Sequence, residues 1–162
     1  MQQSIISGRG DIICGTLWSW GDSDDGSLGN NAHDPIVNRP TQVGSLTDWA
    51  KVTACQSSLA IKTDGTLWGW GGENNEGQIG INSTSRASSP TQVGSDTDWD
   101  SCYGIRDAAI FKKTDGSLWS VGQGTGVGDG QTANRSNPVQ IGSELTWGVI
   151  PTGYGSRAFT TK

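Results

Sequence analysis

The chain has 162 residues, which is enough for one domain with a core of its own. It carries eight tryptophans and 25 glycines although only 32% of its residues are hydrophobic, and this combination predicts an all-β fold in which a few large side chains fill the core between many tight turns. The net charge of −5 argues against a nucleic-acid-binding protein, which normally has a basic surface.

A repeat of about 50 residues organises the sequence. Two blocks recur in phase. Gly-Thr-Leu-Trp-Ser-Trp-Gly at 15–21 returns in related form at 65–71 and 116–122. Pro-Thr-Gln-Val-Gly-Ser at 40–45 returns unchanged at 90–95 and in related form at 138–143. We therefore predict a single repeat domain over residues 1–162, with copies at about 15–64, 65–115 and 116–162.

Residues 1–14 precede the first copy, and we expect them to contain a strand that completes a blade, because 8–13 takes the place of the last strand of a preceding copy. The Arg-Gly-Asp tripeptide at 9–11 falls in this strand, and a chance match is favoured over a role in adhesion. Neither a signal peptide nor an apolar run of about 18 residues is found, so we predict no membrane insertion. The chain then stays where it was made, leaves by an unusual route or is a fragment, and we expect it in a virion or in the cytoplasm.

Four short strands are expected in each copy. In the first strand, Thr16–Trp20, both faces are apolar, as in a strand buried between neighbouring sheets. The other three strands of the first copy are predicted at Gln42–Val43, Trp49–Thr53 and Ser58–Lys62. Short strands repeated radially are typical of a propeller. A solenoid is the alternative, but the variable stretch 29–40 is more typical of a loop between strands.

All eight tryptophans fall on repeat positions, which favours a role in the core of the blades. We assign to this core Trp18, Trp20, Trp49, Trp68, Trp70, Trp99, Trp119 and Trp147. The cysteines Cys14, Cys55 and Cys102 are odd in number and far apart, so we expect buried thiols in a reducing compartment rather than disulfides or a zinc site.

The middle copy resembles the regulator of chromosome condensation repeat. The resemblance rests on Trp70-Gly71, on Gly-Gln-Ile-Gly at 77–80 and on Pro-Thr-Gln-Val at 90–93. The tryptophan-rich form is most similar to repeats in bacterial and phage proteins. The resemblance implies a propeller of seven four-stranded blades that binds partners through loops on its faces or rim.

The chain departs from the family pattern in two ways. The family's histidine is replaced by Ser57, Arg106 and Gly155 in the three copies. Three copies also fall short of seven blades, which would need about 350 residues. We therefore expect an incomplete arc of three four-stranded blades, whose apolar ends are completed or stacked by other subunits. Two chains could close a six-bladed ring, or arcs could stack into a particle or fibre.

The sequence gives little support for a catalytic site or a metal site. The single histidine, His33, lies in a variable loop, and no nucleophile elbow is present, so we predict no catalytic residues, no metal and no cofactor. The acidic run 22–26 is off register for a calcium loop, because its glycine is fifth rather than sixth, and a turn is favoured. The glycosylation sequons at 82–84 and 134–136 are expected by chance in a Ser/Thr-rich chain.

Protein partners are predicted to bind the loops that diverge most between copies, at 30–38, 81–89 and 131–137. The candidate residues are Asn31, His33, Asp34, Asn82, Ser85, Arg86, Thr132, Asn134 and Arg135.

Three functions are weighed. The first is a non-catalytic structural or attachment protein of a multi-subunit assembly, such as a virion or a cell-surface appendage, present as a homo-oligomer or larger assembly. The second is a protein-binding adaptor or inhibitor that uses the variable loops. The third, guanine-nucleotide exchange, is implied by the family's founding member and is the least favoured, since it uses an inserted hairpin and a complete propeller.

Overall fold

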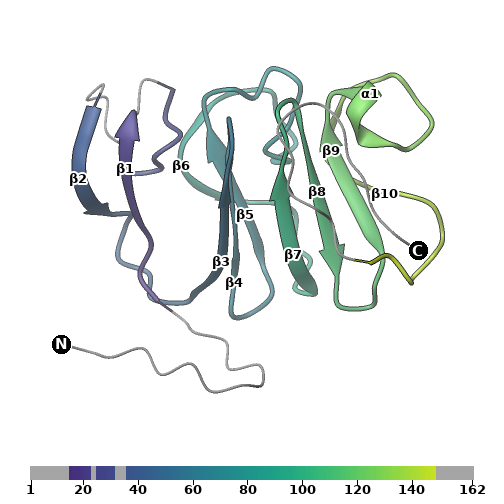
Figure 1. Ribbon diagram of the computed structural model, residues 1–162, viewed down its shortest axis with the longest axis horizontal. Coiled ribbons are helices and arrows are strands. Elements are labelled where there is room, and N and C mark those ends of the chain that lie inside the picture. Colours follow the sequence, from purple (N-terminus) through teal and green to yellow (C-terminus); the bar gives the residue numbers. More distant parts are fainter. Residues whose placement is uncertain (1–14, 23–24, 32–35, 149–162) are drawn as a thin grey trace.

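The computed structural model describes residues 15–22, 25–31 and 36–148, which form antiparallel β-sheets standing side by side (Figure 1). The first sheet pairs β1 (Trp18–Asp22) with β2 (Ile36–Gln42). The second contains β3 (Trp49–Ala54), β4 (Ser58–Lys62), β5 (Leu67–Gly71) and β6 (Ala87–Gln92). The third contains β7 (Trp99–Gly104), β8 (Ala108–Lys113), β9 (Leu118–Gly122) and β10 (Arg135–Gln140), with a single helical turn, α1 (Gly124–Val127), after β9.

The predicted all-β propeller architecture is confirmed. In both four-stranded sheets the spatial order follows the chain order, as expected for strands joined by short connections. The first sheet shows two strands within the described residues. The strand expected in 1–14 lies outside them, and so does the end of the third copy, residues 149–162.

Each four-stranded sheet begins at a tryptophan and combines the end of one sequence copy with the start of the next. The outer strands are longer than the pattern predicts, since β2 runs over Ile36–Gln42 rather than Gln42–Val43. It includes Pro40, which a strand tolerates at the edge of a sheet, where no neighbour needs its missing N–H.

The main core lies between the second and third sheets, where β4 packs against β7. Every residue of β4 is buried, as expected for a strand covered on both faces. The buried cluster at this boundary contains Leu59, Ile61, Leu67, Val93, Trp99, Cys102, Ala109, Phe111 and Val121.

Two Asp-Gly hairpins hold successive sheets together. Gly65 adopts φ +78°, and a Cβ atom there would lie 2.0 Å from the carbonyl oxygen of Thr97, at the start of the next sheet. Gly116 adopts φ +88°, and a Cβ atom would lie 2.1 Å from the carbonyl oxygen of Leu145. Glycine is therefore required both by the left-handed backbone and by the close approach of the neighbouring chain.

Candidate interaction surfaces

The tryptophans divide into a covered group and an exposed pair. Trp49, Trp70 and Trp99 are buried, and Trp68, Trp119 and Trp147 are half-buried. Trp18 and Trp20 on β1 are 49% and 60% exposed, so their assignment to the core does not hold within the described residues. The reason lies in the tertiary structure. Trp70, the counterpart of Trp20, is covered by the first sheet, and its Nε1 donates to the carbonyl of Ser27 at 2.9 Å. No described sheet covers β1 in the same way.

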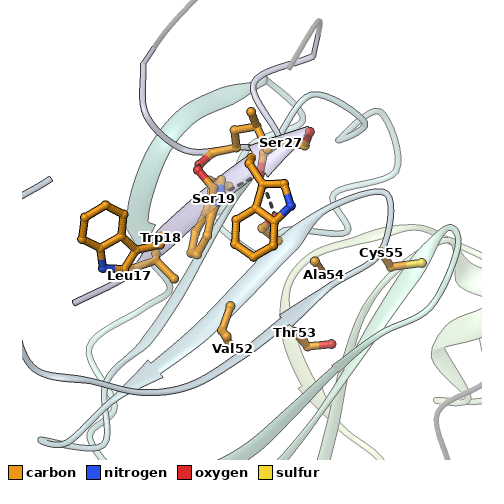
Figure 2. A pocket seen from close by; sticks show the side chains of 12 residues that line it. Leu17, Trp18, Ser19, Ser27, Val52, Thr53, Ala54 and Cys55 are labelled. Atoms are coloured by element: carbon orange, nitrogen blue, oxygen red, sulfur yellow. Dashed lines mark hydrogen bonds between the residues drawn. The ribbon is translucent and has the colours of Figure 1, made fainter. Parts of the chain in front are cut away.

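A cavity of about 310 Å³ opens beside the exposed pair. Figure 2 shows the side chains that line it, with Trp18 and Ser19 on β1 and Val52, Thr53 and Ala54 on β3 or at its end. Val52 is 58% exposed, although its counterpart Cys102 on β7 is buried against the second sheet. Among the described residues, no strand pairs with β1 on the side away from β2. The exposed side chains of β1 and β3 there form one apolar surface, which we call the first-sheet surface: Trp18, Trp20 and Val52.

Two lysines, which the sequence pattern did not predict as part of a site, are enclosed by aromatic rings. Lys62 Nζ lies 5.0 Å from the ring centroid of Trp49 and 4.2 Å from that of Trp68. Its carboxylate partner is Asp48, at 3.6 Å. This arrangement combines cation–π attraction with an ion pair. A lysine directly before Thr-Asp-Gly is the sequence feature that could have identified it.

Lys113 occupies the same position in the third sheet. Its Nζ lies 4.8 Å from the ring centroids of both Trp99 and Trp119. It also lies 2.6 Å from Asp96 and 3.0 Å from Asp98. Burial lowers the pKa of Lys113, but the hydrogen bonds to the two carboxylates outweigh burial, so the net shift of the pKa is upward.

Trp18 is oriented as the lysine-binding tryptophans are. Its Nε1 donates to Thr16 Oγ1 at 2.7 Å. The corresponding bonds are 2.8 Å from Trp68 to Thr66 and 2.9 Å from Trp119 to Ser117. The indole of Trp18 is therefore held by the same local bond as those of Trp68 and Trp119.

Two of the predicted partner-binding residues join neighbouring blades. The backbone N–H of Asn31 donates to the carbonyl of Ser88 at 2.9 Å, and that of Asn82 donates to Ser136 at 2.8 Å. Both asparagines have positive φ, of 54° and 56°, which asparagine tolerates better than most residues. Their side chains also bond across the blades, Asn31 with Ser88 and Asn82 with Asn137, both at 2.9 Å.

Asn134 and Arg135 are also engaged within the protein. Asn134 accepts a bond from the backbone N–H of Gly124 at 3.1 Å and donates to Glu76 of the preceding blade. Arg135 forms an ion pair with Asp129 at 2.7 Å. A bond from the backbone N–H of Gln131, together with Arg135, lowers the pKa of Asp129.

The other predicted loop residues are either exposed or outside the described part of the chain. Ser85, Arg86 and Thr132 are exposed, and no ion pair holds Arg86 within the described part of the chain. His33 and Asp34 lie outside the described residues, as does the Arg-Gly-Asp tripeptide. The described parts of the three loops lie at the same end of the sheets in Figure 1.

The acidic run at 22–26 is described only in part. Asp25 Oδ1 accepts the backbone N–H of Ser27 at 2.9 Å, which is the geometry of an Asx turn. No cluster of three metal-binding side chains is found among residues 15–22, 25–31 and 36–148. Across these same ranges there is also no helix long and apolar enough to cross a membrane.

The family model of the regulator of chromosome condensation (RCC1) repeat matches residues 14–60 and 64–101, which together make up more than half of the chain. The chain belongs to the RCC1 repeat family. No curated protein matches it significantly as a sequence. Its RCC1 blades nevertheless have the arrangement found in solved structures.

Three solved structures are similar in fold. Prp20p from Saccharomyces cerevisiae, described with its binding to Gsp1p and histones, superposes with a TM-score of 0.73 at 20% identity, over 90% of this chain and 38% of Prp20p. Human WBSCR16 superposes with a TM-score of 0.67 at 20% identity, over 88% of this chain and 38% of WBSCR16. Yeast RCC1 (Prp20) bound to Kap60 superposes with a TM-score of 0.72 at 17% identity, over 87% of this chain and 36% of the yeast protein. The chain thus spans well under half the length of these propellers.

Proposed function

We propose that the chain is a non-catalytic assembly module, a structural or attachment protein that binds other protein subunits in a multi-subunit particle such as a virion or a cell-surface appendage. The observation that carries this proposal is the first-sheet surface, where Trp18, Trp20 and Val52 are each about half exposed or more. Contiguous exposed apolar side chains beside an open strand edge are typical of protein-binding surfaces.

The repeat itself supports the need for a partner. Positions Trp20 and Val52 correspond to Trp70 and Cys102, which are 2% and 7% exposed where another sheet covers them. A blade buries its faces only against neighbouring blades, so an uncovered blade at the end of an arc retains a driving force for association.

The surroundings of one buried thiol support a non-catalytic role. Burial raises the pKa of the Cys102 thiol to about 12, which leaves it protonated at neutral pH and unreactive as a nucleophile. The buried Asn74 has a structural role, because its Nδ2 donates to the carbonyls of Ser83 and Ser85 at 2.8 and 2.7 Å.

The test is the mass of the 162-residue chain in solution, measured by light scattering after size exclusion. We expect a mass well above the 17.0 kDa of one chain, and a lower mass for Trp20→Gln, which makes the first-sheet surface polar. Leu46→Gln is the matched control, because Leu46 is 43% exposed but lies outside this surface. A folded wild-type chain that stays monomeric at every concentration would contradict the proposal.

A second candidate function, an adaptor or inhibitor that binds proteins through its loops, is favoured by the exposed Arg86. Prp20p is described with protein partners, Gsp1p, histones and Kap60, which supports protein binding as the role of this chain too. Loss of partner binding in Arg86→Ala, with the oligomer intact, would favour this second function. Guanine-nucleotide exchange remains the least supported function, because a likeness at 20% identity carries the fold alone.

A further inference from the structure

A pocket of about 230 Å³ lies at the boundary between the first and second sheets, and all the residues that line it belong to the described part of the chain. Loops and strands of both sheets supply its walls, which include Asn30, Leu46, Trp49, Trp68 and Pro90. The residues of the first-sheet surface do not line this pocket. It is therefore a separate candidate site.

The boundary between the second and third sheets has the same plan. At each boundary two tryptophans meet edge to face, with ring centroids 5.8 Å apart. Ile81 and Asn30 occupy the same repeat position, because each directly precedes the asparagine that bonds to the next blade. Ile81 packs against the buried cluster of its boundary, whereas Asn30 lines the pocket. The second boundary thus has an aliphatic side chain where the first has an amide beside a cavity.

The lysines at the two boundaries also differ in their carboxylate partners. Lys113 lies 2.6 Å from Asp96 and 3.0 Å from Asp98, so one ammonium group accommodates two carboxylates. At the first boundary Leu46 stands in the place of Asp96. Among the described residues, Lys62 has one carboxylate partner, whose oxygen lies 3.6 Å away, beyond hydrogen-bond distance. The side chain of Lys62 is only 7% exposed, and a lysine so buried normally has a close partner.

The pocket and this lysine share two indole rings. Lys62 Nζ lies 5.0 Å from the ring centroid of Trp49 and 4.2 Å from that of Trp68, and both rings line the pocket. Leu46 lines it too, so the pocket adjoins the position from which the aspartate of the other boundary reaches its lysine. A group that enters here can place an apolar stem against the rings and a negative charge beside the ammonium group.

We propose that this pocket, which we call the boundary pocket, binds a glutamate side chain of a partner protein. The methylene groups of the glutamate take the place that Ile81 fills at the other boundary, and its carboxylate pairs with Lys62 as Asp96 pairs with Lys113. A protein side chain is the occupant because a cavity of about 230 Å³ is smaller than the usual small-molecule site of about 300–1,000 Å³. This inference does not rest on the first-sheet surface.

NMR of the 15N-labelled 162-residue chain tests the boundary pocket. The probe is the blocked tripeptide acetyl-Gly-Glu-Gly-amide, and the matched control is the same peptide with glutamine, which keeps the shape and loses the charge. We expect the indole N–H signals of Trp49 and Trp68 to shift with the glutamate peptide. The glutamine peptide should bind at least about tenfold more weakly, because it lacks a charge-assisted contact. Equal binding of the two peptides, or no shift of either indole signal, would overturn the proposal.

A pair of variants at Leu46 tests the pairing with Lys62. Leu46→Asp provides from the chain itself the carboxylate that Asp96 provides at the other boundary, whereas Leu46→Asn provides the same shape without the charge. We expect Leu46→Asp to bind the glutamate peptide at least about tenfold more weakly than Leu46→Asn, and to unfold at a higher temperature. The temperature difference should disappear when Lys62→Met is added to both. Equal binding by the two variants, or a temperature difference that persists without Lys62, would overturn the pairing.

The source of the carboxylate and the assembly role have separate readouts. Butyrate, a free carboxylate on a short aliphatic chain, should bind more weakly than the glutamate peptide. Butyrate that binds as tightly would assign the boundary pocket to a small molecule and overturn the protein source. The glutamate peptide should leave the solution mass unchanged, and a peptide that lowers the mass would overturn a site separate from the first-sheet surface. The assembly role itself is tested by Trp20→Gln and stands or falls independently of these outcomes.

Discussion

At the scale of single residues, the least expected feature is a pair of lysines enclosed by tryptophans. Lysine is seldom buried unless it is paired, and here each ammonium group has both a carboxylate and two indole rings as partners. The tryptophans themselves meet edge to face, with centroids 5.8 Å apart for Trp49 and Trp68 and for Trp99 and Trp119. Lysine here orders the aromatic core rather than serving as a surface charge.

Lys113→Ala is expected to lower the free energy of unfolding by about 2 kcal/mol, since it removes cation–π contacts and charge-assisted hydrogen bonds from a nearly buried site. Denaturant unfolding measures the loss. Lys51→Ala is the control, because the ion pair of Lys51 with Asp100 is about half exposed and should contribute less than about 1 kcal/mol.

The raised pKa of Lys113 also fixes the sign of a pH effect. The stability that it contributes is complete below the ordinary lysine value of 10.5 and is lost as the pH rises through the higher pKa of the folded state. The difference in stability between wild type and Lys113→Ala should therefore be constant near neutral pH and shrink only in strong alkali. A difference that shrinks between pH 6 and pH 8 would contradict this assignment, given the usual range of lysine pKa values.

At the scale of elements, the Asp-Gly hairpins show how one blade positions the next. Asp64 Oδ1 accepts bonds from the hydroxyl and the backbone N–H of Thr66, at 2.7 and 3.0 Å, and these bonds lower the pKa of Asp64. The backbone N–H of Trp99 then donates to the carbonyl of Gly65 at 3.2 Å. The turn thus closes its own hairpin and also holds the first strand of the following sheet.

Gly65→Ala and Gly94→Ala separate backbone strain from steric collision. Gly94 has φ +61° with open space around its Cβ position, so its substitution should cost only the left-handed penalty of about 1–2 kcal/mol. Gly65→Ala adds a collision with the carbonyl of Thr97 and should be clearly more destabilising. Thermal unfolding of the two variants compares them. An equal loss of thermal stability in the two variants would mean that the next sheet shifts away from the new Cβ atom at no cost in free energy.

At the scale of the whole molecule, stability should vary along the arc. Among the described residues, the boundary between the second and third sheets contains the largest buried cluster, whereas the first sheet has two strands and exposed tryptophans. Amide hydrogen exchange should therefore be slowest in β4 and β8 and fastest in β1. If a second copy binds the first-sheet surface, exchange in β1 should slow as the protein concentration rises, while exchange in β8 stays unchanged. Concentration-independent exchange in β1 would contradict association at this edge.

The sequence by itself determined the repeat, the all-β class, the approximate strands and the family, because these depend on short-range alternation, turn residues and a period that is visible in the chain. The tertiary structure alone decided which equivalent residues are covered. Trp20 and Trp70 share one repeat position, yet one is 60% exposed and the other 2%, since burial depends on whether another sheet stands beside the strand. It also decided that Asn31 and Asn82 join blades and that Lys62 and Lys113 lie between indole rings, because these contacts form between blades or across strands that are distant in the sequence.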